Sequence, residues 1–138
     1  TEHRNGQGET ILVVDDESAV LDLTAALLEQ RGYRPLTAQN GYAALALFNE
    51  RPDEIRLVIT DLDMPGISGA RLVAALRDLR PDLPMLVCTG SDVSEAKNLR
   101  VQAVLPKPFE TSVLLQQIER ALRWHGNDKP HPPTKPAS

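Results

Sequence analysis

The sequence predicts an α/β fold in which a doubly wound sheet of five parallel strands carries helices on both faces. Three observations support this prediction. Short apolar runs alternate along the chain with longer segments of helical periodicity, and unbroken apolar runs are typical of strands covered on both faces. Only 4% of the residues are aromatic, so leucine, valine, isoleucine and alanine must form the core. The 138 residues suffice for one domain that needs no metal or disulfide to hold a core.

The first half of the domain is predicted to contain three strands and two helices. In chain order they are a strand at 11–14, a helix over 20–28, a strand at 34–38, a helix at 41–50 and a strand at 57–60. The first helix should end at Gly32, because glycine favours helix C-termini. The second strand is less apolar and no chemically active residue follows it, which suits an edge strand.

The second half of the domain is predicted to add two strands and three helical segments. In chain order they are a helix around 72–76, a strand at 85–88, a short polar helical stretch at 92–99, a strand at 103–105 and an amphipathic helix at 113–122. The stretch at 92–99 has few apolar anchors, so we expect it to be abbreviated or mobile.

The two ends of the chain differ in composition from the middle. Residues 1–10 are polar without periodicity, and residues 125–138 contain four of the 11 prolines. We therefore expect a polar linker at 1–10, a folded domain at 11–124 and a disordered proline-rich tail at 125–138. The first residue is threonine rather than methionine, and both a stand-alone domain and a segment of a longer protein are open at this point.

Composition excludes several classes of function. The net charge is −4, with no cluster of Lys and Arg that could follow a phosphate backbone, so we expect no direct nucleic-acid binding. No apolar run approaches the roughly 18 residues of a membrane span, so we expect no membrane contact. The single cysteine, Cys88, cannot form an internal disulfide and is expected to be an inert core thiol. Such cysteine usage fits a reducing compartment and predicts a cytoplasmic location.

Polar side chains follow four of the five predicted strands. They are Asp15, Asp16 and Glu17 after the first, Asp61 and Asp63 after the third, Thr89 (followed by Gly90) after the fourth, and Lys107 after the fifth. Taken singly, each has an ordinary interpretation as a helix cap, a turn residue or a solvated lysine. Their shared position is more informative, because sites in such sheets form beyond the carboxyl ends of the strands.

Together these side chains favour phosphoryl chemistry. In the usual strand order 2-1-3-4-5 the first and third strands are neighbours, which brings together Asp15, Asp16 and Asp61. Three crowded carboxylates repel one another unless a cation joins them, and Mg²⁺ suits a site with few carboxylates and several waters. Thr89 adds a hydroxyl donor and Lys107 a positive charge. An aspartate in such surroundings can accept a phosphoryl group.

Residues 11–123 resemble the receiver domain of bacterial two-component response regulators. The matching motifs are Ile-Leu-Val-Val-Asp15-Asp16-Glu17, Leu-Val-Ile-Thr-Asp61-Leu-Asp-Met-Pro-Gly, Leu-Val-Cys-Thr89-Gly90 and Leu-Pro-Lys107-Pro108-Phe109. The resemblance implies a flavodoxin-like fold and a role for each site residue. Asp61 would be the phosphoacceptor and a Mg²⁺ ligand, and Asp16 would be a direct Mg²⁺ ligand. Asp15 would bind Mg²⁺ through water and Asp63 through its backbone carbonyl. Thr89 would supply a mobile hydroxyl and Lys107 a paired ammonium, and the bond between Lys107 and Pro108 would be cis.

The resemblance also implies how the domain acts. It would take a phosphoryl group from a histidine kinase or a histidine phosphotransfer domain within a phosphorelay, change conformation to signal, and slowly hydrolyse its own acyl phosphate, so it is expected to be a phosphoacceptor module rather than an enzyme. The lead-in Gly-Glu-Thr-Ile-Leu-Val-Val is similar to that of receivers in hybrid sensor kinases. An excised regulator domain, a stand-alone receiver and a homodimer are all left open.

Two other functions deserve comparison. The Asp61-Leu62-Asp63 segment also fits the start of haloacid-dehalogenase-like phosphatases, in which the first aspartate is the nucleophile and the second a general acid. In that superfamily an acidic pair follows the lysine, whereas here it precedes the segment. A receiver-like interaction module that never takes phosphate is disfavoured, because such modules lose site residues that this chain keeps.

The chain departs from the receiver pattern in two places. Val104 stands where the family often has an aromatic residue, three positions before Lys107. Thr89 and Lys107 are also only 18 positions apart (107 − 89), several fewer than is common. We therefore expect an altered surface around the fourth helical segment and a conformational change that does not use an aromatic rotamer.

Overall fold

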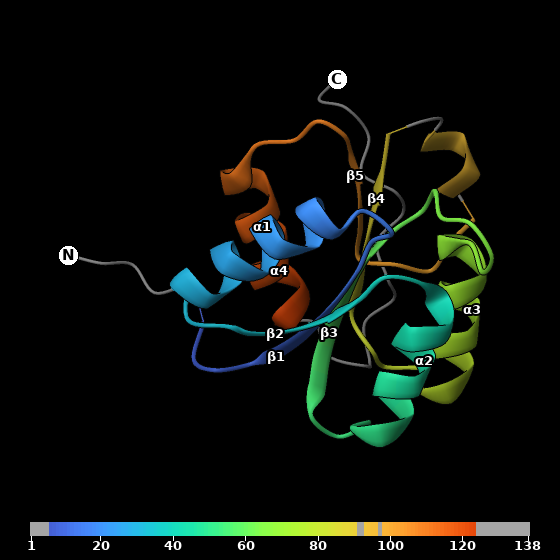
Figure 1. The fold of residues 1–138 in the computed structure, drawn as a ribbon, viewed down its shortest axis with the longest axis horizontal. Helices are drawn as coiled ribbons and strands as arrows, with labels where there is room; N and C mark the ends of the chain where they lie inside the picture. Colours follow the sequence, from blue (N-terminus) through green and yellow to red (C-terminus); the bar gives the residue numbers. More distant parts are fainter. Residues whose placement is uncertain (1–5, 91–92, 97, 124–138) are drawn as a thin grey trace.

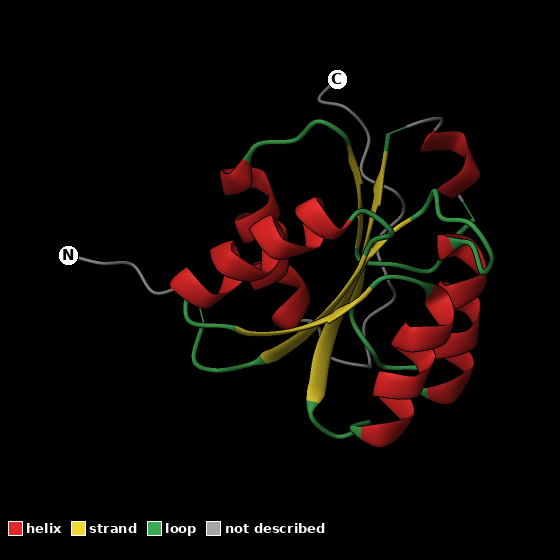
Figure 2. Ribbon diagram, viewed as in Figure 1, coloured by secondary structure: helices red, strands yellow, loops and turns green. Residues whose placement is uncertain are grey.

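The computed structural model describes residues 6–90, 93–96 and 98–123 as three layers, a central sheet between two layers of helices (Figures 1 and 2). The strands are parallel and ordered β2-β1-β3-β4-β5, as predicted. The elements are β1 (Thr10–Val14), α1 (Ser18–Gln30), β2 (Arg34–Ala38), α2 (Gly41–Glu50), β3 (Ile55–Asp61), α3 (Gly69–Leu79), β4 (Met85–Thr89), the 3-10 helix η1 (Val93–Ala96), β5 (Ala103–Pro106) and α4 (Thr111–Leu122).

Each face of the sheet has its own apolar core. Because successive side chains of a strand point to opposite faces, Leu12 and Val14 of β1 pack towards α2 and α3, whereas Ile11 and Val13 pack towards α1 and α4. Figure 1 shows these two helix pairs on opposite sides of the sheet. Both cores consist mainly of aliphatic residues, as the low aromatic content predicts.

The ends of several elements differ from the sequence-based prediction. The predicted linker at 1–10 ends too late, because β1 already begins at Thr10. Thr10 is buried and pairs in register with Arg34 of β2. Upstream of it, the backbone N–H of Gly6 donates to the carbonyl of Arg31 at 2.8 Å, and that of Gly8 donates to the carbonyl of Gly32 at 2.7 Å. Residues 6–9 therefore lie along the turn after α1. The proposed tail at 125–138 and Trp124 lie outside the described residues.

The predicted helix terminator Gly32 behaves as expected. Helix α1 ends at Gln30, and Gly32 has a φ of 89°, a backbone conformation that residues with a Cβ rarely adopt.

Among the described residues, no helix combines the length and the apolar character needed to cross a bilayer.

In its described residues, 93–96 and 98–102, the segment between β4 and β5 contains the 3-10 turn η1 and no α-helix. Of the expected apolar anchors of this segment, Ala96 is fully buried and Leu99 is half-buried. Arg77 of α3 helps to hold this side of the molecule, because its guanidinium donates to the carbonyls of Leu83 and Arg100 at 2.6 and 2.5 Å. A cavity of about 310 Å³ lies between α3 and residues 98–100. Among the described residues, the helical part of this segment is four residues long, shorter than the predicted stretch at 92–99.

Candidate functional site

Three aspartates meet at the carboxyl edge of the sheet. Asp15 directly follows β1 and Asp61 ends β3, and the two strands pair in the register Val14 with Thr60. One carboxylate oxygen each from Asp15, Asp16 and Asp61 lies within 4.8 Å of the others. Asp15 and Asp61 are 5% and 6% exposed, whereas Asp16 faces solvent. The cluster predicted from strand order is therefore present, with one side open to water.

Backbone hydrogen bonds orient the two buried carboxylates. The N–H of Glu17 donates to Asp15 Oδ1 at 2.9 Å just before α1 begins. The N–H of Asp63 donates to Asp61 Oδ1 at 3.3 Å. Both are Asx-type turns, in which a short acidic side chain hydrogen-bonds the backbone two residues later. The ordinary interpretation of Asp61 as a turn residue is thus also correct, whereas Asp15 forms a turn and does not cap α1. These turns fix the direction in which the second oxygens of both aspartates point.

Lys107 brings the positive charge of the site. Its Nζ lies 3.4 Å from Asp15 Oδ2 and 3.6 Å from Asp61 Oδ2. The N–H of Lys107 donates to the carbonyl of Thr89 at 2.7 Å, which continues the pairing of β4 with β5 beyond the strands. The Lys107–Pro108 peptide bond is cis, as the resemblance implies. Burial lowers the pKa of Lys107, but the nearby carboxylates of Asp61 and Asp15 outweigh this effect and raise it above its ordinary value.

The pKa of Asp61 is also raised, for a different reason. Burial is the largest cause, because it disfavours the charged form. The N–H bond from Asp63 and the ammonium of Lys107 act in the opposite direction, and the neighbouring charge of Asp15 adds to the rise. Asp61 is therefore a carboxylate largely removed from water and held beside the ammonium group of Lys107.

Thr89 makes a contact that the sequence does not predict. Its hydroxyl belongs to a fully buried residue and donates to Asp63 Oδ2 at 3.2 Å. The N–H of Gly90 approaches the same oxygen at 3.4 Å. The receiver resemblance implies a role only for the backbone carbonyl of Asp63, and no local pattern signals a side-chain contact between residues 26 positions apart.

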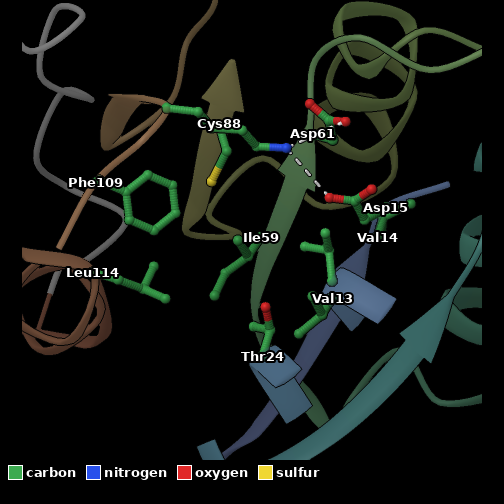
Figure 3. A pocket seen from close by; sticks show the side chains of 11 residues that line it. Val13, Val14, Asp15, Thr24, Ile59, Asp61, Cys88, Phe109 and Leu114 are labelled. Atoms are coloured by element: carbon green, nitrogen blue, oxygen red, sulfur yellow. Dashed lines mark hydrogen bonds and ion pairs between the residues drawn. The ribbon is translucent and has the colours of Figure 1, made fainter. Parts of the chain in front are cut away.

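A small cavity of about 30 Å³ lies beneath the site (Figure 3). Asp15 and Asp61 lie at one end of it, and Ile59, Phe109 and other apolar side chains line the rest. Cys88 also borders this cavity, and complete burial raises the pKa of its thiol to about 12. This supports the interpretation of Cys88 as an inert core thiol.

The geometry can stabilise a group that carries several negative oxygens. The Lys107 ammonium and the carboxylates of Asp15 and Asp16 lie around the buried Asp61 carboxylate, and the three carboxylates together suit a hard divalent cation. Every residue predicted for the site lies within this edge of the sheet.

Comparisons with known proteins agree with this arrangement. The family model described as response regulator receiver domain matches residues 11–119. The phosphate regulon transcriptional regulatory protein PhoB of Pseudomonas aeruginosa is 34% identical over 125 residues, which cover 86% of this chain and 54% of PhoB. The sensor kinase CckA of Brucella abortus is 33% identical over 117 residues, covering 82% of this chain and 12% of CckA. The chain thus spans about half of the first relative and a small part of the second.

Solved structures show the same fold. A response regulator receiver domain protein from Clostridium thermocellum superposes with a TM-score of 0.78 at 32% identity, covering 82% of this chain and 93% of that one. The response regulator TrrA of Thermotoga maritima, solved in complex with Mg²⁺ and BeF, gives a TM-score of 0.75 at 30% identity, covering 82% of this chain and 98% of that one.

The family match, the relatives and the fold agree with the chemistry at the strand ends, and no observation favours the phosphatase alternative. The chain belongs to the receiver domains of two-component response regulators.

Proposed function

We propose that this domain accepts a phosphoryl group on Asp61 from a histidine kinase or a histidine phosphotransfer domain, in a reaction that depends on Mg²⁺. The observation that carries the proposal is the position of Asp61, which is buried at the end of β3 with Lys107 Nζ 3.6 Å away and with Asp15 and Asp16 close enough to share one cation. Asp15 shares the burial, the ammonium partner and the cation cluster. We prefer Asp61 as the acceptor because it stands at the phosphoacceptor position that the receiver resemblance implies.

The donor set fits magnesium. All of its members are oxygen atoms, and Asp16 faces water, which leaves room for the water ligands that Mg²⁺ usually keeps. We propose Asp16 and Asp61 as direct ligands, with Asp63 ligating through its backbone carbonyl and Asp15 through water. When bound, the ion would neutralise charge on the oxygens of the transferring phosphoryl group.

Side chains of the domain would carry out the transfer and the later hydrolysis of the phosphoryl group. A carboxylate oxygen of Asp61 forms a bond to phosphorus while the bond between phosphorus and the donor's imidazole nitrogen breaks, and the electron pair stays on that nitrogen. Lys107 offsets the charge that Asp61 gains, and the Thr89 hydroxyl donates a hydrogen bond to a phosphoryl oxygen. Attack by water then returns Asp61 and inorganic phosphate. We propose that this step is slow, so the domain acts as a signalling module rather than as an enzyme.

The context of the domain is part of the proposal. A receiver domain occurs in relatives as different as the transcriptional regulator PhoB and the sensor kinase CckA, so both a regulator and a hybrid kinase are suitable hosts. We propose residues 11–124 as the receiver, extended at its start by Thr10, and a cytoplasmic histidine kinase pathway as its partner. Light scattering with and without phosphorylation would show whether the domain is a monomer or a homodimer.

The test is direct phosphorylation of the purified domain. With Mg²⁺ and acetyl phosphate, intact-mass spectrometry should show one added phosphoryl group that hydroxylamine removes, as it does from acyl phosphates. Asp61→Asn should abolish the addition, because the amide is not a nucleophile for phosphorus. Asp22→Asn, which changes an exposed carboxylate on α1, should leave it unchanged. Phosphorylation of Asp61→Asn at the wild-type level would contradict the assignment.

A further inference from the structure

The carboxylate of Asp63 connects two loops at the edge of the site. Asp63 lies in the loop after β3, and its Oδ2 receives the hydroxyl of Thr89 at 3.2 Å and the N–H of Gly90 at 3.4 Å from the end of β4. We call this pair of hydrogen bonds the Asp63 latch. Thr89 is fully buried, whereas Asp63 lies at the surface, so the buried hydroxyl points towards the rim of the site.

We propose that the Asp63 side chain is a positioning residue that holds the Thr89 hydroxyl away from Asp61 in the unphosphorylated domain, and that a phosphoryl group on Asp61 releases it. This inference rests on the proposed function, and it assigns to the side chain of Asp63 a role separate from that of its backbone carbonyl.

The latch competes directly with the role proposed for Thr89. A hydroxyl has one proton to donate, so a hydroxyl bonded to Asp63 Oδ2 cannot donate to a phosphoryl oxygen on Asp61 at the same time. The bond to a carboxylate is also stronger than one between neutral groups. Breaking it is therefore a cost that the phosphorylated state must offset.

The position of Asp63 explains how phosphorylation would shift this competition. The N–H of Asp63 donates to Asp61 Oδ1 at 3.3 Å, so the Asp63 carboxylate lies two residues from the acceptor on a segment bonded to it. Added negative charge on Asp61 would attract the Thr89 hydroxyl and repel the Asp63 carboxylate. Both effects favour the released state, which is the differential interaction that a two-state change requires.

The latch also offers a route for the signal that does not need an aromatic residue. Val104 is fully buried in the core that faces α2 and α3 and has no polar atom in its side chain. Release of Asp63 frees the Gly90 N–H together with the Thr89 hydroxyl, because both donate to the same oxygen. The backbone after β4 would therefore respond directly to the state of Asp61.

Binding of beryllofluoride with Mg²⁺ provides the first test, because this complex imitates a phosphoryl group on aspartate. Asp63→Ala should lower the beryllofluoride concentration for half-saturation by about tenfold, the effect of removing one charge-assisted hydrogen bond that opposes binding. Glu17→Gln removes one exposed carboxylate near the site without touching Thr89, and it measures the general effect of charge. The change in Asp63→Ala should exceed that of Glu17→Gln.

A double-mutant cycle separates the latch from simple charge repulsion. In the Thr89→Val background, which keeps the shape of the buried side chain and removes the hydroxyl, Asp63→Ala should no longer improve binding beyond the change in Glu17→Gln. An equal improvement in both backgrounds would show that Asp63 acts only through its charge, and the proposal would be wrong.

Amide exchange at Gly90 tests the latch without any phosphoryl analogue. In metal-free protein, Asp63→Ala should speed exchange of the Gly90 amide several-fold, because its acceptor is removed. Unchanged exchange would overturn the latch. Failure of the wild-type domain to bind beryllofluoride would instead contradict the proposed function, and the exchange measurement would still decide whether the latch exists.

Discussion

At Asp61, burial and a nearby ammonium group act on the pKa in opposite directions, and burial prevails. The ionised Asp61 carboxylate lowers the free energy of unfolding, because a carboxyl group whose pKa is raised on folding binds its proton more tightly in the folded state. For Lys107, a raised pKa has the opposite effect on stability. Its pKa is raised by Asp61 and Asp15, so its charged form favours the folded state.

These shifts predict how stability depends on pH in metal-free buffer. The free energy of unfolding should fall as pH rises from the ordinary pKa of 3.8 through the raised pKa of Asp61, because the unfolded chain releases the proton first. The stabilisation from Lys107 should persist below its ordinary pKa of 10.5 and be lost as pH rises through its raised value. Urea unfolding across the acidic range should show that Asp61→Asn lacks the first decrease. An identical slope in both proteins would contradict the raised pKa.

Asp16 provides the second prediction for a single residue. Asp16→Ala should weaken Mg²⁺ binding by about tenfold or more, since it removes a proposed direct ligand. Metal-free stability should change by no more than about 0.5 kcal/mol, or rise slightly, because Asp16 is exposed and its removal relieves repulsion within the cluster. Titration calorimetry and urea unfolding measure the two effects. Asp22→Ala, on the exposed face of α1, is the matched control, and unchanged Mg²⁺ affinity in Asp16→Ala would exclude it as a ligand.

Among the helices and strands, α3 begins directly against the end of β3, where Asp61 lies. It begins at Gly69, where a Cβ would meet the Asp61 carbonyl oxygen and would lie 2.6 Å from Leu62 Cα. The Gly69 N–H donates to the carbonyl of Leu62 at 3.0 Å, and the preceding Ser68 caps the helix by accepting from the Arg71 N–H at 3.3 Å. The helix thus packs its first turn directly against the backbone that carries the phosphoacceptor.

This contact predicts a large effect of one methyl group. Gly69→Ala should destabilise the domain by about 1–3 kcal/mol, because the new Cβ meets backbone atoms that cannot move independently of the strand end. It should also slow phosphorylation by displacing Asp61. Gly90→Ala is the matched control for stability, since its Cβ would approach no atom closer than 4.0 Å. Equal stability of the two variants under urea would show that α3 does not pack as tightly as described.

At the scale of the whole molecule, the question is how far a change at Asp61 extends. The described strands and four α-helices enclose two aliphatic cores. The described residues between β4 and β5 form a 3-10 turn in place of an α-helix. A region with few buried contacts opens at lower free energy than a packed core. The response to phosphorylation is therefore expected at the carboxyl end of β4 rather than throughout the sheet.

Hydrogen exchange with and without beryllofluoride should show this distribution. The largest changes are expected at Thr89, Gly90 and the η1 turn, with little change at Val104, whose buried side chain has no alternative aromatic position. Val104→Tyr should cost about 1–3 kcal/mol by overpacking the core and still allow phosphorylation of Asp61, because the chemistry lies at the strand ends. A large change centred on Val104 with an unchanged β4 end would contradict this prediction.

Much of this protein is determined by local sequence patterns. Apolar runs and helical periodicity predicted the five strands, because backbone hydrogen bonding and side-chain alternation repeat at short range. Their order followed from the usual arrangement of a doubly wound sheet, and the structure confirms it. The cluster of Asp15, Asp16 and Asp61 followed from that order, since parallel strands place their carboxyl ends at one edge. The motifs around Thr89 and Lys107 then indicated the receiver family, which the family model confirms.

The tertiary structure alone decided the features that depend on register and on the paths of loops. The bond between Thr89 and Asp63, the contact of Gly69 with the strand end, and the start of β1 at Thr10 each join segments that are not neighbours along the chain. A loop's path follows from what both of its ends pack against, and a residue's own neighbours carry little of that information. The sequence alone therefore determined which chemical groups reach the site, whereas tertiary packing decided which of them hold one another.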